Sequence, residues 1–304
     1  MEEELIKLVS HFDKILEKHS LNTKIILDRL YNTEYMTYKN NMINVEYQLS
    51  KDLEKVTECY DLSSLSGALI PIVKIDKGTI TFVKTICAIN EKNTNMKESM
   101  IYYLLKAIST DIKFTKAYYK KRKIHSGFVD ILYEDKKNKI KCTEIDEYEY
   151  INEGVLCYLT EEMYKEIYKE AVKVKKIDNK YKVLDKNYLA KEITRILNFV
   201  VYEKESYEEI LAEYLKNDIE KFLMNIQLQT SLEKAEVLEI YKIANLFLEG
   251  KTVCKSIYTK ESYMVDTLKD FINNMYNIAK EKNIEKTEHF FAKELNKEIF
   301  SNIF

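Results

Sequence analysis

Three carboxylates near the middle of this chain have the spacing of a metal site. Asp130 lies in one run of alternating apolar residues, and Glu144 and Asp146 lie two residues apart in the next such run. If the two runs pair as a hairpin, the carboxylate oxygens fall on one face of a sheet, which is the arrangement that Mg²⁺ requires. Such a site would support a metal-dependent nuclease or a phosphoryl-transfer enzyme.

A basic segment lies just before these carboxylates. Residues 113–126, KFTKAYYKKRKIHS, combine cations with aromatic rings and contain no acid. Cations neutralise backbone phosphates and aromatic rings stack on bases or sugars, so this segment could bind a nucleic acid from a helix or from a helix-to-strand connection. The residues expected to make these contacts are Lys113, Lys116, Tyr118, Tyr119, Lys120, Lys121, Arg122 and Lys123. The alternative interpretation is a solvated lysine-rich surface, with His125 as a surface or capping residue.

An acidic segment follows the carboxylates. Residues 144–153, EIDEYEYINE, contain five acids and no base. Because the basic and acidic segments flank a predicted hairpin over residues 128–146, we expect their charges to neutralise each other in part. Surface pairs of this kind are worth about 0–1 kcal/mol each, so the basic segment would stay able to exchange its acids for phosphates.

Motifs of high specificity are absent from the sequence. It contains no GxxxxGK[ST], GxGxxG, HExxH or GxSxG pattern, so the nucleotide-binding, zinc-protease and hydrolase interpretations lack their physical basis. Restriction-endonuclease-like enzymes carry Glu-x-Lys on the second strand of their site, whereas this chain has Glu144-Ile145-Asp146. We therefore expect no cofactor and no bound metal, and the carboxylates remain an alternative.

The composition is that of a folded domain protein with a substantial core. The chain has 304 residues, of which 46% are hydrophobic and 32% are charged, and its formal charge is −2. That charge excludes a globally basic protein but allows a local phosphate-binding surface. No run reaches the roughly 18 apolar residues of a membrane span, and the acidic start does not resemble a secretory signal. The five cysteines have no CxxC spacing, so we expect reduced, mostly buried thiols and a cytoplasmic protein without membrane contact.

Glycine and proline divide the chain into two parts. Four of the five glycines and the only proline, Pro71, lie between residues 67 and 154. These residues mark turns, so the first part should be turn-rich and the second nearly all helical. The sequence predicts a mixed α+β domain over residues 1–160 and a helical domain over residues 161–304.

Periodicity predicts the elements of the first domain. Residues 5–16 and 25–30 have helical spacing, residues 43–49 alternate as a strand, and residues 96–110 return to helical spacing. Two hairpins are predicted, one over residues 68–89 with Asp76-Lys77-Gly78 at its turn and one over residues 129–145, and 154–159 is interpreted as a short buried strand. Pro71 should lie on an edge or at a bulge. Together these strands predict one mainly antiparallel sheet of five or six strands.

Capping signals predict the helices of the second domain. Thr160 is expected to cap one helix, and Ser206-x-x-Glu209 and Thr230-x-x-Glu233 have the capping-box pattern. Residues 193–201, 259–279 and 287–300 read as further amphipathic helices. The aromatic and aliphatic stripe of the last of these is expected in the core, and the alternative is an interface with a second copy or another protein.

Residues 153–177, EGVLCYLTEEMYKEIYKEAVKVKKI, carry a resemblance to a known family. The passage from a mixed half through a short strand into an aromatic-bearing helix and a helical remainder resembles the KwaB-type subunit of the Kiwa phage-defence system. The resemblance is compositional and implies contact with nucleic acid in a defence role.

These observations favour a cytoplasmic, non-enzymatic binding protein that contacts nucleic acid through the basic segment. The helical half would then mediate association with itself or with a protein partner. Two alternatives remain open: a metal-dependent nuclease or phosphotransfer enzyme that uses Asp130, Glu144 and Asp146, and a protein-interaction module in which the charged segments bind each other or a charged partner.

Overall fold

The chain forms two compact units. The computed structural model describes residues 2–39, 42–47, 56–61, 67–76, 79–90, 96–112, 121–136, 139–145, 147–169, 188–203, 206–249 and 258–294. The first unit comprises Met1–Asp146, Thr160–Val183 and Leu215–Asn217, and the second comprises Glu147–Leu159, Leu184–Tyr214 and Asp218–Phe304. The mixed first part and the helical remainder agree with the predicted fold class. Residue 160 lies inside a helix, α4 (Glu149–Tyr168), which contributes residues to both units.

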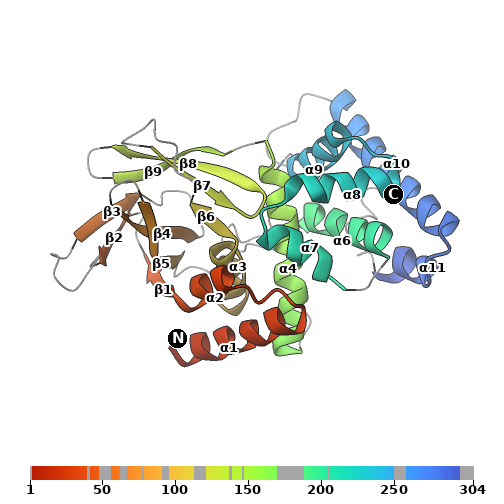
Figure 1. Ribbon diagram of the computed structural model, residues 1–304. Coiled ribbons are helices and arrows are strands. Elements are labelled where there is room, and N and C mark those ends of the chain that lie inside the picture. Colours follow the sequence, from red (N-terminus) through yellow and green to blue (C-terminus); the bar gives the residue numbers. More distant parts are fainter. Residues whose placement is uncertain are drawn as a thin grey trace. The chain divides into compact units, whose positions relative to one another are not determined.

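Two helices open the first unit (Figure 1). They are α1 (Glu2–Lys18) and α2 (Lys24–Tyr31), and both were predicted from their apolar spacing. Leu8, Phe12 and Leu16 of α1 are buried, as a stripe at helical spacing requires. Thr23 caps α2, since its hydroxyl accepts a hydrogen bond from the Ile26 amide at 3.3 Å.

A three-stranded sheet follows in the order β1 (Thr33–Tyr38), β5 (Thr79–Asn90) and β4 (Gly67–Asp76). β4 and β5 pair antiparallel, which confirms the predicted hairpin, and β1 runs parallel to β5. Pro71 lies in β4, which is an edge strand of the sheet. Edge strands tolerate proline because a residue without an amide hydrogen cannot donate a ladder bond. Its predicted place on an edge is therefore confirmed.

A six-stranded sheet makes up the rest of the β structure. Its order is β2 (Met42–Tyr47), β3 (Val56–Asp61), β9 (Lys139–Ile145), β8 (Val129–Lys136), β7 (Lys121–Ser126) and β6 (Thr110–Ile112). All neighbours are antiparallel except β3 and β9. The described strands thus form two sheets where the sequence predicted one. The predicted hairpin over residues 129–145 is confirmed as β8 and β9.

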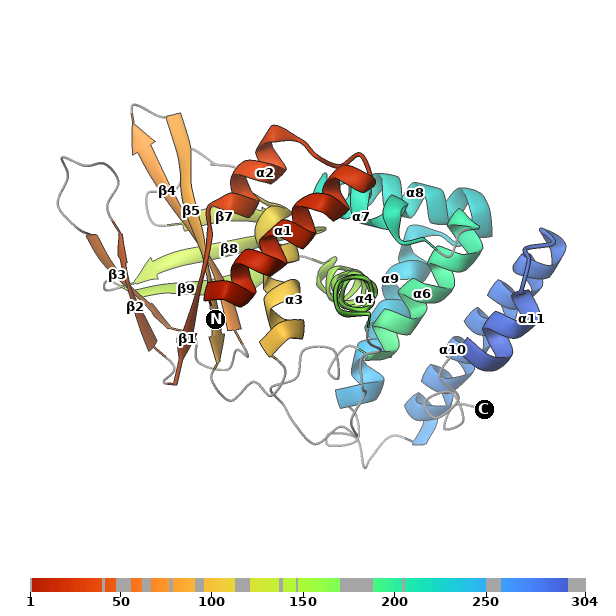
Figure 2. The ribbon, with the colours of Figure 1, turned by 90° about the horizontal axis from the view of Figure 1, so that it is seen from below.

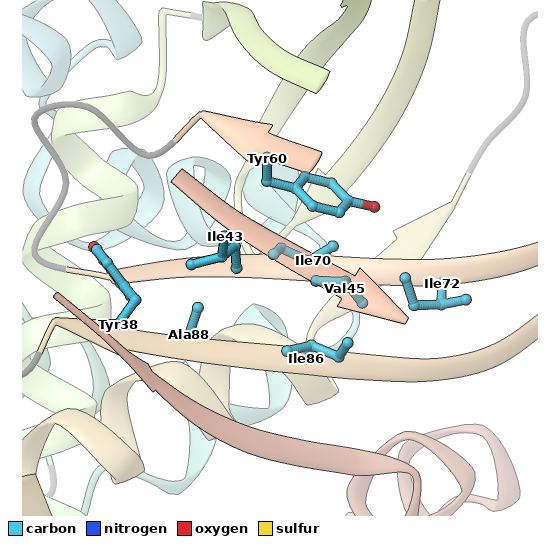
Figure 3. Close-up of a cluster of buried hydrophobic side chains, with 8 residues drawn as sticks. All are labelled: Tyr38, Ile43, Val45, Tyr60, Ile70, Ile72, Ile86 and Ala88. Atoms are coloured by element: carbon cyan, nitrogen blue, oxygen red, sulfur yellow. The ribbon is translucent and has the colours of Figure 1, made fainter. Parts of the chain in front are cut away.

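The two sheets of the first unit share one core cluster, which Figure 3 shows. β2 and β3 supply Ile43, Val45 and Tyr60, which pack against residues of the three-stranded sheet. Those residues are Tyr38, Ile70, Ile72, Ile86 and Ala88. On β2 the alternation is clear, because Ile43 and Val45 are buried whereas Asn44 and Glu46 are exposed. Burial of one face of each sheet against the other fixes the register of the strands.

The opposite face of the three-stranded sheet packs on α3 (Met96–Ile108). The Tyr35 hydroxyl donates to the Met100 carbonyl at 2.6 Å, and the Cys87 thiol lies 3.5 Å from the Tyr103 carbonyl. A Cβ at Gly67 would lie 2.3 Å from the Tyr103 ring, so only glycine fits there. From Glu98 to Leu105 every residue of α3 is buried, which makes this helix the central element of the first unit.

The second unit is helical. It contains the first part of α4, then α6 (Tyr188–Tyr202), α7 (Glu208–Leu215), α8 (Ile219–Thr230), α9 (Lys234–Glu249) and α10 (Tyr258–Glu281), and ends in α11 (Thr287–His289) and a π-helical turn, η1 (Phe290–Glu294). Most of α7 belongs to this unit, while Leu215 counts with the first. Figure 2 shows α6 and α9 beside α4.

Two predictions for the helical part are wrong. Residues 154–159 belong to α4 and form no strand, so Thr160 lies within a helix and does not cap one. This part of α4 is buried on all sides, and a continuous apolar run has no period that separates a buried helix from a buried strand. Further along, α7 ends at Leu215, and Asp218 caps α8 by accepting a hydrogen bond from the Lys221 amide.

The described part of the C-terminal stripe packs on α6 and α10. Phe290 is 5% exposed and its ring stacks on Phe199 of α6, with the ring centroids 4.0 Å apart. Phe291 contacts both rings and also Tyr276 of α10, edge to face. The core interpretation is confirmed for Phe290, Phe291 is partly exposed, and Leu295 to Phe304 lie outside the described residues.

Candidate functional site

The structure describes only the second part of the basic segment, residues 121–126. Lys113, Lys116, Tyr118, Tyr119 and Lys120 lie outside the described residues. Lys121, Arg122 and Lys123 begin β7, for which the structure describes the backbone at these positions. The placement on a helix or helix-to-strand connection is therefore wrong for residues 121–126. Alternation of isoleucine and serine with charged residues, KRKIHS, explains why this stretch forms a strand of a half-buried sheet.

The register of four strands divides these residues between two faces. β6 pairs with β7, β7 with β8 and β8 with β9, so directly opposed residues share a face (Figure 1). His125 is opposite Asp111 on one side and Asp130 on the other. A bulge between Leu132 and Tyr133 shifts the pairing, which places Glu144 opposite Leu132 and on the face of Asp130.

The face that contains His125 is charged, and we call it the charged face. It holds the positions of Asp111 on β6, of Lys121, Lys123 and His125 on β7, of Asp130, Leu132, Glu134 and Lys136 on β8, and of Lys139, Lys141 and Glu144 on β9. The opposite face is mostly apolar, with positions such as Ile112, Ile124, Val129, Ile131, Ile140 and Ile145, although Arg122 and Asp135 fall on it too. The apolar face is thus suited to packing in the core, and the charged face is suited to contact with solvent or a ligand.

Burial agrees with this division. Thr110, Ser126 and Val129 of the apolar face are between 1% and 3% exposed, and the Ser126 hydroxyl bonds to Thr110 at 3.2 Å. On the charged face, the side chains of His125 and Asp130 are 21% and 25% exposed and that of Asp111 is 46% exposed. The described side chains of the charged face therefore reach the surface of the first unit.

His125 and Asp130 form a close pair on this face. Nδ1 of His125 contacts Oδ1 of Asp130, directly across the hairpin of β7 and β8. Gly127, with a φ of 61°, begins the two-residue turn that sets these positions opposite each other. A proton on Nδ1 that faces the carboxylate leaves the ring lone pair on Nε2. Such a pair can orient and strengthen a histidine base.

Asp111 is held by a cation from α2. Arg29 Nη2 donates to its carboxylate at 3.1 Å, and Nη1 donates to the Ile108 carbonyl at 3.1 Å. Burial lowers the pKa of the Arg29 guanidinium, and the charge of Asp111 opposes this change. The two contacts fix the start of β6 against the end of α3. Two of the four carboxylate positions on the charged face, Asp111 and Asp130, thus have basic partners. The other two, Glu134 and Glu144, share the face with five lysine positions.

The predicted metal site is described only in part. Asp130 contacts His125, Glu144 is placed by the backbone register, and Asp146 lies outside the described residues. Within the part of the chain that the structure describes, no group of three or more His, Cys, Asp or Glu residues is arranged to hold a metal ion.

The acidic segment has a partner that the sequence did not indicate. Glu147 lies 3.2 Å from Lys234 of α9, and Lys234 also contacts the ring and hydroxyl of Tyr148. Glu149 and Glu153 lie in α4. These contacts fix the start of α4 within the second unit, so Glu147 has at least one role outside the predicted neutralisation of the basic segment.

Two of the cysteines are buried. Cys87 and Cys157 are both 0% exposed, as expected for small apolar residues. Burial raises the pKa of the Cys87 thiol, so this thiol is a poor nucleophile. Only the backbone of Cys142 is described, on the apolar face of β9.

The second unit contains buried charged residues that the sequence did not predict. Lys191 and Glu192 of α6 are 1% and 2% exposed, with 3.6 Å between Nζ and Oε1. Glu213 of α7 is 2% exposed and accepts hydrogen bonds from Tyr202 at 2.5 Å and Asn225 at 2.8 Å. Glu213 interrupts an otherwise apolar stripe, which is the one sequence signal that could have found it. Burying a charge is costly unless the charge is paired and hydrogen-bonded, so these contacts allow the charged side chains to lie in the helical core.

Comparisons with known proteins give no relative: no family model, curated protein or solved structure matches the chain. Among the described helices, none combines the length and the apolar character that crossing a bilayer requires.

Proposed function

We propose that this protein binds nucleic acid through the charged face of β6 to β9 and the adjoining basic residues 113–120. The observation that supports the proposal is the register, which places Lys121 and Lys123 on the same face as His125, opposite to the buried face. Lys136, Lys139 and Lys141 occupy positions on the same face of the next two strands. Lysines spaced along neighbouring strands can follow a phosphate backbone, and residues 113–120, which lie outside the described residues, add Lys113, Lys116 and Lys120 between β6 and β7 in the sequence.

Salt dependence tests this proposal. Fluorescence anisotropy with labelled single-stranded RNA, single-stranded DNA and duplex DNA should give a log K that falls linearly with log[KCl], by about 0.7 per neutralised phosphate for a single strand. Replacing Lys121 and Lys123 together by Gln should weaken binding and reduce that slope by roughly one to two phosphate contacts. An affinity that does not change with salt would contradict the proposal.

Arg122 supplies a matched control. It lies between the two lysines on the same strand and carries the same charge, but its position is on the apolar face. Arg122→Gln should leave the salt slope unchanged, with any loss of folding stability read separately from thermal unfolding. If Arg122→Gln lowers the slope as much as the double lysine variant does, the segment binds without regard to face and the sheet argument fails.

The other sequence hypotheses stay predictions. A metal-dependent nuclease that uses Asp130, Glu144 and Asp146 predicts Mg²⁺-dependent cleavage that Glu144→Ala abolishes. Association through the helical half predicts a molar mass above that of one chain in light scattering. A role in phage defence, as the KwaB-type resemblance implies, predicts protection of cells in plaque assays.

A further inference from the structure

His125 and Asp130 are placed for chemistry, beyond the binding of phosphates. We propose that this pair is the general-base dyad of an RNA-cleaving activity on the charged face, an inference that rests on the proposed nucleic-acid binding. The observations are the contact between Nδ1 of His125 and Asp130, the partial exposure of both side chains, and the lysine position two residues before His125 on the same face. This chemistry differs from the metal-dependent alternative, in which Asp130 would be a metal ligand.

The fold supplies the geometry of the dyad. The two residues lie on adjacent strands at directly opposed positions, where Cβ atoms are about 4.5–5.5 Å apart, and the tight turn at Gly127 restricts movement of the hairpin. Asp111, opposite His125 on β6, is engaged by Arg29. Rigid placement on paired strands is what a catalytic group requires, because a base must hold its orientation toward the substrate.

RNA is the substrate class that a general base can cleave without further catalytic side chains. Its 2′-hydroxyl is an attached nucleophile, so a base and nearby cations suffice, whereas DNA offers no such internal nucleophile. Nε2 of His125 takes the 2′-hydroxyl proton, the 2′ oxygen attacks phosphorus, and the bond from phosphorus to the 5′ oxygen breaks. The leaving 5′ oxygen takes a proton from water, and the imidazolium returns its proton to the hydroxide that forms. The products are a 2′,3′-cyclic phosphate and a 5′-hydroxyl, and lysines on the face would stabilise the charge on phosphorus.

The experiment measures cleavage and binding on the same samples. The full chain, in excess, is incubated with a short fluorescein-labelled single-stranded RNA in EDTA, with the same sequence carrying 2′-O-methyl riboses, and with the corresponding DNA. We expect cleavage of the RNA alone, with cyclic-phosphate ends detected by mass spectrometry. Anisotropy on the 2′-O-methyl strand gives the affinity without cleavage.

Three variants locate the activity. His125→Gln should lower the single-turnover rate by about 10²–10⁴-fold and leave the Kd for the 2′-O-methyl strand unchanged. Asp130→Asn, which keeps the shape of a positioning residue, should lower the rate at least about tenfold, also without a change in Kd. His11→Gln, an exposed histidine of α1, should cleave like the wild type and controls for contaminating ribonuclease.

The outcomes separate the two proposals. If neither the 2′-O-methyl strand nor the DNA is bound, both the proposed function and the dyad are wrong. If only the DNA is bound, the proposed function stands and the dyad is wrong. If the 2′-O-methyl strand is bound and the wild type does not cleave RNA, the binding proposal stands and the dyad assignment fails. Equal cleavage by wild type and a folded His125→Gln variant, or equal cleavage of DNA, also overturns the assignment.

Discussion

Gly154 of α4 lies against the ring of Tyr241 on α9. A Cβ at residue 154 would be 2.7 Å from Cε1 of Tyr241 and 2.9 Å from the Ala190 carbonyl oxygen of α6. Three helices of the second unit therefore meet at a point where only a hydrogen atom fits. The sequence analysis counted Gly154 among the glycines that mark turns, whereas the structure requires it for close packing of helices.

Replacing Gly154 by Ala should destabilise the second unit. Overpacking of a filled core costs about 1–3 kcal/mol, and the gain in helix propensity of about 0.5–1 kcal/mol offsets only part of it. Urea unfolding followed by circular dichroism measures the difference. Adding Tyr241→Leu to Gly154→Ala should cost less than the sum of the single changes, and strict additivity would show that the ring is not the obstacle.

Removing the Tyr241 hydroxyl should cost about 1 kcal/mol. This hydroxyl lies 2.8 Å from the Thr194 hydroxyl, and both side chains are 0% exposed. Tyr241→Phe leaves the ring packing intact and removes one buried hydrogen bond. Tyr276→Phe, which removes an exposed bond to Glu288, should leave the free energy of unfolding within about 0.5 kcal/mol of the wild type. Equal losses in both variants would contradict this.

The stability of the second unit should depend on pH through Glu213. Burial raises the pKa of this carboxyl, although the hydrogen bond from Tyr202 and the charge of Lys221 oppose the change. A raised pKa in the folded state means that folding favours the protonated form, so stability falls as pH rises from the unfolded pKa through the folded one and then levels off. Unfolding free energies measured between about pH 4 and 7 should therefore decline less in Glu213→Gln than in the wild type. Parallel profiles would refute the assignment.

Truncating Phe290 should unfold the end of the second unit first. Its ring stacks on Phe199 with an interplanar angle of 3°, and Phe→Ala changes in cores cost about 3–5 kcal/mol. Hydrogen exchange should show the loss at α11 and α6. Leu228→Ala, at a residue that is 70% exposed, should stay within about 0.5 kcal/mol of the wild type. A small effect at Phe290 would mean that the stack does not hold the C-terminal turn.

Local signals in the sequence predicted local structure well. The hairpins over residues 67–90 and 129–145 follow from alternation on either side of a short polar turn, and the apolar spacing of residues 5–16 defines α1. Pairings between strands that lie far apart in the sequence were not predictable in this way. β1 pairs with β5 and β3 with β9, and such parallel contacts leave no mark in the sequence near either strand. This is why the sequence predicted one sheet where the structure has two.

The candidate site was predicted in composition but not in geometry. The sequence indicated Asp130 and the lysines of residues 121–123, and it treated His125 as a surface or capping residue. The pairing of His125 with Asp130 depends on the length of the turn at Gly127, because a turn one residue longer would place them on opposite faces. The turn Ser126-Gly127-Phe128-Val129 was the signal that could have revealed it.

The parallel pairs also set an order for biosynthesis. β1 leaves the ribosome well before β5, its partner in the described sheet, and the β2 and β3 hairpin must wait for β9. The six-stranded sheet cannot close until Ile145 has emerged, so the growing chain carries β2 and β3 without their partner β9 through nearly half of its translation. During that interval a nascent-chain chaperone would find its binding site at the unpaired edge of β3, and slower translation after residue 145 would favour correct assembly of the first unit.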